Sequence, residues 1–133
     1  MRALLDTNIL ARAARGGTSP ASELVERLAS LPHVLIVSPF LLSELSRVLR
    51  YERMREMHGL DEQGINAYVQ RIGAASLALN VPRAPSSVVP HDPDDDPVIA
   101  AAVAAQADVI CTRDRHFQHP DVQAYSSQHG IRT

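Results

Sequence analysis

Lysine is absent from this chain, and its absence excludes several kinds of site. All 13 basic residues are arginine. A P-loop requires a Gly-Lys-Ser/Thr sequence, and a phosphoryl-receiver domain requires a lysine beside its acidic pocket, so neither class fits. The sequence also has no Gly-x-Gly-x-x-Gly for dinucleotide binding and no Gly-x-Ser-x-Gly turn for a serine nucleophile.

Cysteine and long apolar runs are equally scarce. Cys111 is the single cysteine, which excludes an intrachain disulfide and favours a reducing cytoplasm. We expect it to be a packed core thiol. No Cys/His spacing indicates a zinc site. The first apolar run ends at Asp6, too early for a signal peptide, and no run approaches the ~20 residues that span a bilayer. We therefore expect a cytoplasmic protein that does not associate with a membrane.

The composition is that of one soluble globular domain spanning residues 1–133, with 45% hydrophobic and 21% charged residues. The net charge of −2 argues by itself against nucleic-acid binding. However, if four of the 15 acids surround bound metal, 15 − 4 = 11 acids remain against 13 arginines. The arginines at 47, 50, 53 and 55 are either phosphate-binding forks or a solvated helix face.

Short apolar runs alternate with helical patterns along the chain. Strands are predicted at residues 2–5, 33–37, 77–81, 107–112 and 131–133. Helices are predicted at residues 9–14, 20–30, 39–50 with a continuation over 51–57, 61–75, 97–107 and from 119 onward, with Ser-Pro pairs as start signals at 19–20 and 38–39. This alternation predicts a three-layer α/β/α fold with a central parallel sheet of four to five strands.

Acidic residues follow two of the predicted strands and open one helix. Asp6 comes directly after the first strand, Asp114 follows the strand at 107–112, and Asp96 begins the Ala-rich helix. Glu44 lies within the apolar stripe of the helix at 39–50. Because loops at the carboxyl ends of parallel strands converge, these acids are expected to share one crevice.

Clustered carboxylates repel one another, so they require a divalent cation, raised pKa values or solvent exposure. Their hard oxygen atoms favour Mg²⁺ or Mn²⁺, and two such ions can activate water and stabilise the leaving oxygen of a phosphodiester. We expect Asn8 and Thr112 to position water or an outer ligand, and Thr7 to make a turn hydrogen bond.

Each acid also has a simpler interpretation. Asp6 and Asp96 are both suited to capping the helix that follows them. Glu44 is also compatible with a position at the margin of its stripe, reaching solvent. Asp92, Asp94 and Asp95 crowd the turn before Asp96, and one of them is an alternative to Asp96 as the ligand.

Taken together, three segments resemble the PIN-domain family. LLDTN resembles its opening strand and first acid, Asp6, and SPFLLSEL resembles the helix that carries its second acid, Glu44. DPVIAAAVAAQADVICTRDRHF is similar to its third block, with Asp96, Thr112 and Asp114. The resemblance implies a nuclease that requires Mg²⁺ or Mn²⁺ and acts on RNA. It also implies a homodimer, and a toxin of a type II toxin–antitoxin pair whose antitoxin blocks the acidic groove.

The first hypothesis is accordingly a metal-dependent endoribonuclease for single-stranded RNA, in which Arg12, Arg47 and Arg113 hold the RNA backbone. The alternative is a catalytically silent PIN-like module that binds nucleic acid or protein. An aspartyl-nucleophile phosphatase built on Asp6 is a third option, but that chemistry usually requires a second aspartate two residues later, where this chain has Asn8.

Overall fold

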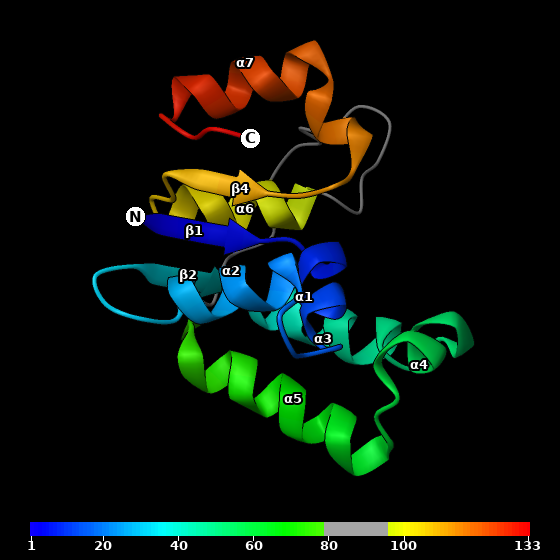
Figure 1. Ribbon diagram of the computed structural model, residues 1–133. Coiled ribbons are helices and arrows are strands. Elements are labelled where there is room, and N and C mark those ends of the chain that lie inside the picture. The colour runs from blue at the N-terminus through cyan, green and yellow to red at the C-terminus, as the bar shows by residue number, and fades with distance from the viewer. Residues whose placement is uncertain (79–95) are drawn as a thin grey trace.

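The computed structural model describes residues 1–78 and 96–133, which form a parallel β-sheet surrounded by helices (Figure 1). β1 lies at the centre, paired with β2 on one side and β4 on the other, and β2 pairs with β3, giving the order β3-β2-β1-β4. The predicted α/β fold with a parallel sheet is confirmed. The strands are β1 (Arg2–Leu5), β2 (Val34–Val37), β3 (Leu77–Ala78) and β4 (Val109–Cys111).

The helices begin where the sequence supplies caps. Ser19 and Ser38 each precede a proline and accept a hydrogen bond, at 3.2 Å, from the backbone N–H three residues later. Asp61 caps α5 in the same way. These side chains satisfy N–H groups that the first helical turn leaves without partners. The helices are α1 (Thr7–Ala13), α2 (Pro20–Leu28), α3 (Pro39–Val48), α4 (Glu52–His58), α5 (Glu62–Ala75), α6 (Asp96–Ala104) and α7 (Pro120–Gln128), with a 3-10 helix η2 (Arg115–Gln118).

The helices lie on both faces of the sheet. Because parallel crossovers are right-handed, the steps from β1 to β2 and from β2 to β3 place α1 to α5 on one face, while the reversed step to β4 places α6 on the other. The packing of α1 against α2 and α3, and of α3 against α5, agrees with this arrangement. Figure 1 shows α2 in front of the sheet and α6 behind it. Strand residues such as Leu4, Leu5 and Ile36 are therefore fully buried.

The sheet is smaller than the upper limit of the prediction. Three strands have three or four residues, and β3 has two described residues. The remainder of the strand predicted at 77–81 lies outside the described residues. The strand expected at 131–133 is wrong, because it contributes a single bridge between Val109 and Arg132. Ile131 instead donates its N–H to Ser126 O at the end of α7 and buries its side chain, so Arg132 alone is left to pair.

Two helix boundaries also differ from the prediction. The helix expected to run without interruption from 39 to 57 is broken at Tyr51, whose extended backbone makes it the N-cap of α4. The helix expected to reach 107 ends earlier because Gln106 adopts the left-handed conformation. Arg2 then caps the end of that helix, donating from Nε and Nη2 to Ala105 O at 2.9 and 2.7 Å.

Candidate functional site

The candidate site lies where the sheet order reverses, at the carboxyl ends of β1 and β4. From β1 the chain crosses to β2 on one side, and β4 lies on the other side, which is the arrangement that opens a crevice for ligands in α/β sheets. Asp6 follows β1 directly, and its backbone N–H donates to Cys111 O at 3.0 Å. Thr112 and Asp114 follow β4. The predicted meeting of these two chain segments is therefore present.

Asp6 is a buried carboxylate whose side chain is held by three donors. It is only 5% exposed. Oδ1 accepts from Thr7 N at 2.7 Å, and Oδ2 accepts from Thr112 Oγ1 at 2.7 Å and Asn8 Nδ2 at 3.0 Å. These bonds fix the plane of the carboxylate and stabilise its charged form. Asp6 is also the N-cap of α1, so the capping interpretation is correct and describes part of what this residue does.

Thr112 connects the two ends of the site. Its hydroxyl donates its single proton to Asp6 Oδ2 and accepts from Asp114 N at 3.0 Å and Asn8 Nδ2 at 3.3 Å. Asn8 also joins the segment after β1 to the segment after β4, because its Oδ1 accepts from Arg113 N at 3.2 Å. Asn8 and Thr112 therefore contact Asp6 directly, which is a closer association than the water-positioning role predicted for them.

Asp114 is half-buried and is the N-cap of η2. Its Oδ1 accepts from His116 N at 2.9 Å and lies 3.0 Å from His116 Nδ1. No helix is predicted over residues 114–117, yet the structure has a 3-10 turn from Arg115 onward. The Asp114 cap allows the next residues to close a 3-10 turn over the buried Phe117 side chain.

The remaining predicted acids lie on neighbouring helices. Glu44 is half-buried on α3, between the fully buried Leu41 and Leu45, and α3 packs against α1. Asp96 is the first residue of α6. The side chain of Asp96 lies outside the described part of the structure, and so do Asp92, Asp94 and Asp95.

The described acids do not complete a metal site by themselves. Within residues 1–78 and 96–133, leaving aside the Asp96 side chain, no three Asp, Glu, His or Cys side chains are grouped closely enough to hold a metal ion. Asp6, Glu44 and Asp114 therefore fall short of such a group. Their oxygen donors are nevertheless of the kind that Mg²⁺ and Mn²⁺ prefer.

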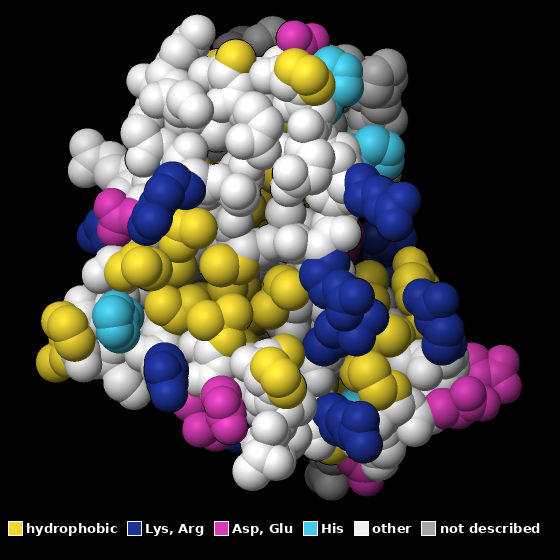
Figure 2. All heavy atoms as spheres, turned by 45° about the horizontal axis from the view of Figure 1, so that its top comes forward, with side chains coloured by type: hydrophobic (Ala, Val, Ile, Leu, Met, Phe, Trp, Pro, Cys, Tyr) yellow, Lys and Arg dark blue, Asp and Glu magenta, His cyan; other side chains and the backbone are white. Residues whose placement is uncertain are grey.

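The arginines divide into exposed and paired groups. Arg12 on α1, Arg47 on α3 and Arg113 beside the site are exposed. Figure 2 shows arginine side chains on both sides of the visible face, several of them close together on the right. In contrast, Arg50 and Arg55 both pair with Glu62. The cluster at 47–55 is thus partly a solvated ion-pair network.

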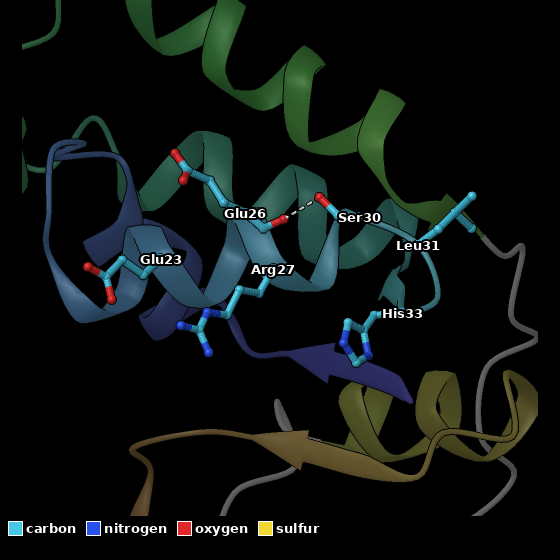
Figure 3. Close-up of a pocket in the computed structure, with 6 residues that line it drawn as sticks. All are labelled: Glu23, Glu26, Arg27, Ser30, Leu31 and His33. Atoms are coloured by element: carbon cyan, nitrogen blue, oxygen red, sulfur yellow. Dashed lines mark hydrogen bonds between the residues drawn. The ribbon is translucent and has the colours of Figure 1, made fainter.

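A hollow lies at the opposite end of the sheet, in the described part of the chain. It has a volume of about 540 Å³ and is open to solvent. Figure 3 shows that it is lined by residues of α2 and of the turn into β2, including Glu26, Leu31 and His33. His33 precedes the first residue of β2, so the hollow opens at the amino edge of the sheet and is separate from the acids.

Two further side chains depart from expectation. Thr7 was expected to make a turn hydrogen bond, but its hydroxyl oxygen is buried and has no hydrogen-bond partner among the described residues. Cys111 is half-buried rather than fully packed in the core, and burial raises the pKa of its thiol. Neither property could be recognised from spacing alone.

None of the helices in the described residues combines the length and apolar character that a membrane span requires.

Comparisons with known proteins identify the family. Searches of curated proteins and of solved structures returned no match to this chain. The family model for the PIN domain matches residues 2–116, which include Asp6, Glu44, Asp96 and Asp114. This protein belongs to the PIN-domain family.

Proposed function

We propose that this PIN domain is a metal-dependent endoribonuclease that cleaves single-stranded RNA. PIN domains are generally nucleases. The observation that carries the proposal is the buried Asp6 carboxylate, fixed by Thr7, Asn8 and Thr112 at the same edge as Asp114. Burying a carboxylate is costly. A capping aspartate can remain exposed, as Asp61 does, so capping alone gives no reason for the burial of Asp6.

The residues that would hold Mg²⁺ or Mn²⁺ are Asp6, Asp114, Glu44 and Asp96. Asp92 or Asp95 would assist, because the described side chains form no group of three metal ligands. A divalent ion bound there supplies positive charge for the developing oxyanions and lowers the pKa of water.

The chain's own residues would orient the reaction. The three donors to Asp6 prevent its carboxylate from rotating, and Thr112 keeps the Asp114 segment in register with Asp6. The exposed guanidinium groups of Arg12, Arg47 and Arg113 match the geometry of phosphate oxygens and would hold the RNA backbone.

The experiment is cleavage of single-stranded RNA in the presence of Mg²⁺ or Mn²⁺. EDTA and Asp6→Asn should each abolish cleavage. The matched control is Asp61→Asn, because Asp61 is also an N-cap aspartate but is exposed and remote from the site. Asn caps a helix about as well as Asp, so the control should cleave normally. Cleavage that survives both EDTA and Asp6→Asn would overturn the proposal.

The biological role that we propose is that of a toxin acting in the cytoplasm. We further propose that the chain forms a homodimer and that a cognate antitoxin protein covers its acidic groove. Induced expression should arrest growth, Asp6→Asn should relieve the arrest, and a small neighbouring reading frame encoding a DNA-binding protein should also relieve it.

A catalytically silent binding module is the second candidate. It is favoured by the lack of a three-ligand group among the described side chains and by the capping contacts of Asp6 and Asp114. A silent module would bind RNA or a partner protein equally well in the wild type and in Asp6→Asn, without cleavage in either.

A further inference from the structure

Phe40 is an aromatic side chain that the fold leaves in solvent. It is 43% exposed, whereas its neighbour Leu41 and the other phenylalanine, Phe117, are fully buried. Fully burying a phenylalanine side chain stabilises a fold by about 1.5–3 kcal/mol. Phe40 does not contribute this full stabilisation, because its ring remains partly in solvent. Its position and its neighbours indicate what it contacts instead.

Phe40 lies at the same sheet edge as the acids. β1 and β2 are in register with Leu4 opposite Ile36, and continuing that register places Asp6 level with Ser38. Neighbouring strands are ~4.8 Å apart. Phe40 comes only two residues after Ser38, in the first turn of α3. Figure 1 shows α1 and α3 at the end of the sheet to which the arrowhead of β1 points.

Phe40 also shares one face of α3 with two charged residues. Phe40, Glu44 and Arg47 are spaced i, i+4, i+7, which places them in one stripe along the helix. Phe40 and Arg47 are exposed and Glu44 is half-buried. The buried stripe of Leu41, Leu45 and Leu49 lies about 120° away around the helix. One face of α3 therefore presents an aromatic ring, then a carboxylate, then a guanidinium.

We propose that Phe40 is a stacking platform for an unpaired base of the RNA, and that it makes this enzyme selective for single strands. The inference rests on the proposed function. An exposed ring stacks any base that is free of pairing, and a neighbouring arginine can hold the phosphate of the same strand. A base inside a duplex cannot reach the ring. Carboxylates and guanidinium groups flanking a single ring are less suited to the core of a protein interface, from which charges are depleted.

The test compares Phe40 variants on short single-stranded RNA oligonucleotides with Mn²⁺ present. Phe40→Ala and Phe40→Leu should raise KM by about 5- to 100-fold and leave kcat unchanged, whereas Phe40→Trp should keep the wild-type KM. Leu31→Ala is the matched control, because Leu31 is 94% exposed but lies near the amino edge of the sheet. Oligonucleotides that carry one abasic site at each position in turn sharpen the test. The wild type should bind one of these abasic oligonucleotides more weakly than the intact RNA. Phe40→Ala should bind that oligonucleotide and the intact RNA equally well.

The outcomes separate this inference from the proposed function. If the wild type cleaves RNA and Phe40→Ala matches it on every oligonucleotide, base stacking is overturned and the nuclease assignment stands. Loss of self-association in Phe40→Ala with unchanged RNA kinetics would make the surface a protein interface and would also overturn stacking. If the wild type does not cleave, the proposed function fails. Fluorescence anisotropy with the same oligonucleotides then decides, because equal affinity of the two proteins overturns stacking and weaker binding by Phe40→Ala supports it.

Discussion

Asp6 and Glu62 are both carboxylates that accept several hydrogen bonds, but they differ in burial and in the charge of the groups that donate to them. Asp6 is buried and held by a backbone N–H, an amide and a hydroxyl, none of which carries a charge. The Glu62 side chain is 58% exposed and is held by the guanidinium groups of Arg50 and Arg55. Hydrogen bonds from those two arginines lower the pKa of Glu62.

The difference bears on which of the two acids suits the chemistry that we propose. Pairing with two cations in water neutralises Glu62 and contributes little to stability, because solvent screens exposed pairs. In contrast, the three described donors to Asp6 are neutral groups, which fix the orientation of the carboxylate. A buried anion arranged in this way is costly for folding and is suited to attracting a cation.

The largest effect is expected from Thr112→Val, which keeps the shape of the side chain and removes the hydroxyl. Asp6 Oδ2 loses a donor and Asp114 N loses its acceptor. Because hydrogen bonds to charged groups are worth about 1.5–3 kcal/mol, the free energy of unfolding should fall by ~2 kcal/mol. RNA cleavage should fall about 10- to 100-fold. Chemical denaturation and single-turnover kinetics measure the two effects.

Thr112→Ser is the control for that change, because it restores the hydroxyl without the methyl group. It should recover most of the stability and cleavage lost in Thr112→Val. Equal losses in both variants would show that packing of the methyl group, and not the hydroxyl, maintains the site.

An intermediate effect is expected at Tyr68, which joins the two regions by donating its phenolic O–H to Leu10 O. Burial raises the pKa of Tyr68, and this outweighs the opposing effect of Arg71. The folded protein therefore keeps the phenol neutral. This contribution is complete below pH ~10, the ordinary pKa of tyrosine, and is lost as the pH rises above it. Tyr68→Phe should cost about 1 kcal/mol at neutral pH.

The alkaline dependence checks the same idea independently. Urea denaturation between pH 9 and pH 11, in the wild type and in Tyr68→Phe, should show a smaller loss of stability in the variant. Parallel curves would mean that the Tyr68 hydroxyl is not buried in the manner described.

The smallest effect is expected from Glu62→Gln. The folded pKa of Glu62 is lowered, so its contribution is present above its ordinary pKa and is lost as the pH falls below it. Glu62 is exposed and its ion pairs are screened by solvent, so the unfolding midpoint should change only slightly, and less still at high salt. A loss comparable to that of Thr112→Val would remove the distinction between the two carboxylates.

The sequence predicts the features that depend on neighbouring residues. Ser19 and Ser38, each followed by proline, mark two helix starts correctly because capping is a contact over three residues. The run from Arg2 to Leu5 is a strand because a continuous apolar segment suits a sheet covered on both faces. Placing Asp6 and Asp114 at strand ends was enough to predict that their segments meet.

The features that the sequence could not predict depend on distant contacts. The helix break at Tyr51, between α3 and α4, contains no Gly or Pro from which it could have been predicted. It accompanies Arg50, which donates to Ser46 O on its own helix and reaches Glu62 and Asn66 on α5. Likewise, the bond between Thr112 and Asp6 joins residues separated by 106 positions. Spacing identified both residues as candidates but could not show that they touch.

The most direct measurement is calorimetric titration of Mn²⁺ into the metal-free protein and into Asp6→Asn. The account predicts saturable binding to the wild type, and binding at least tenfold weaker in the variant, because one charged ligand is replaced by a neutral amide of the same shape. No binding to the wild type, or equal binding to both proteins, would contradict the claim that Asp6 is organised to hold a cation.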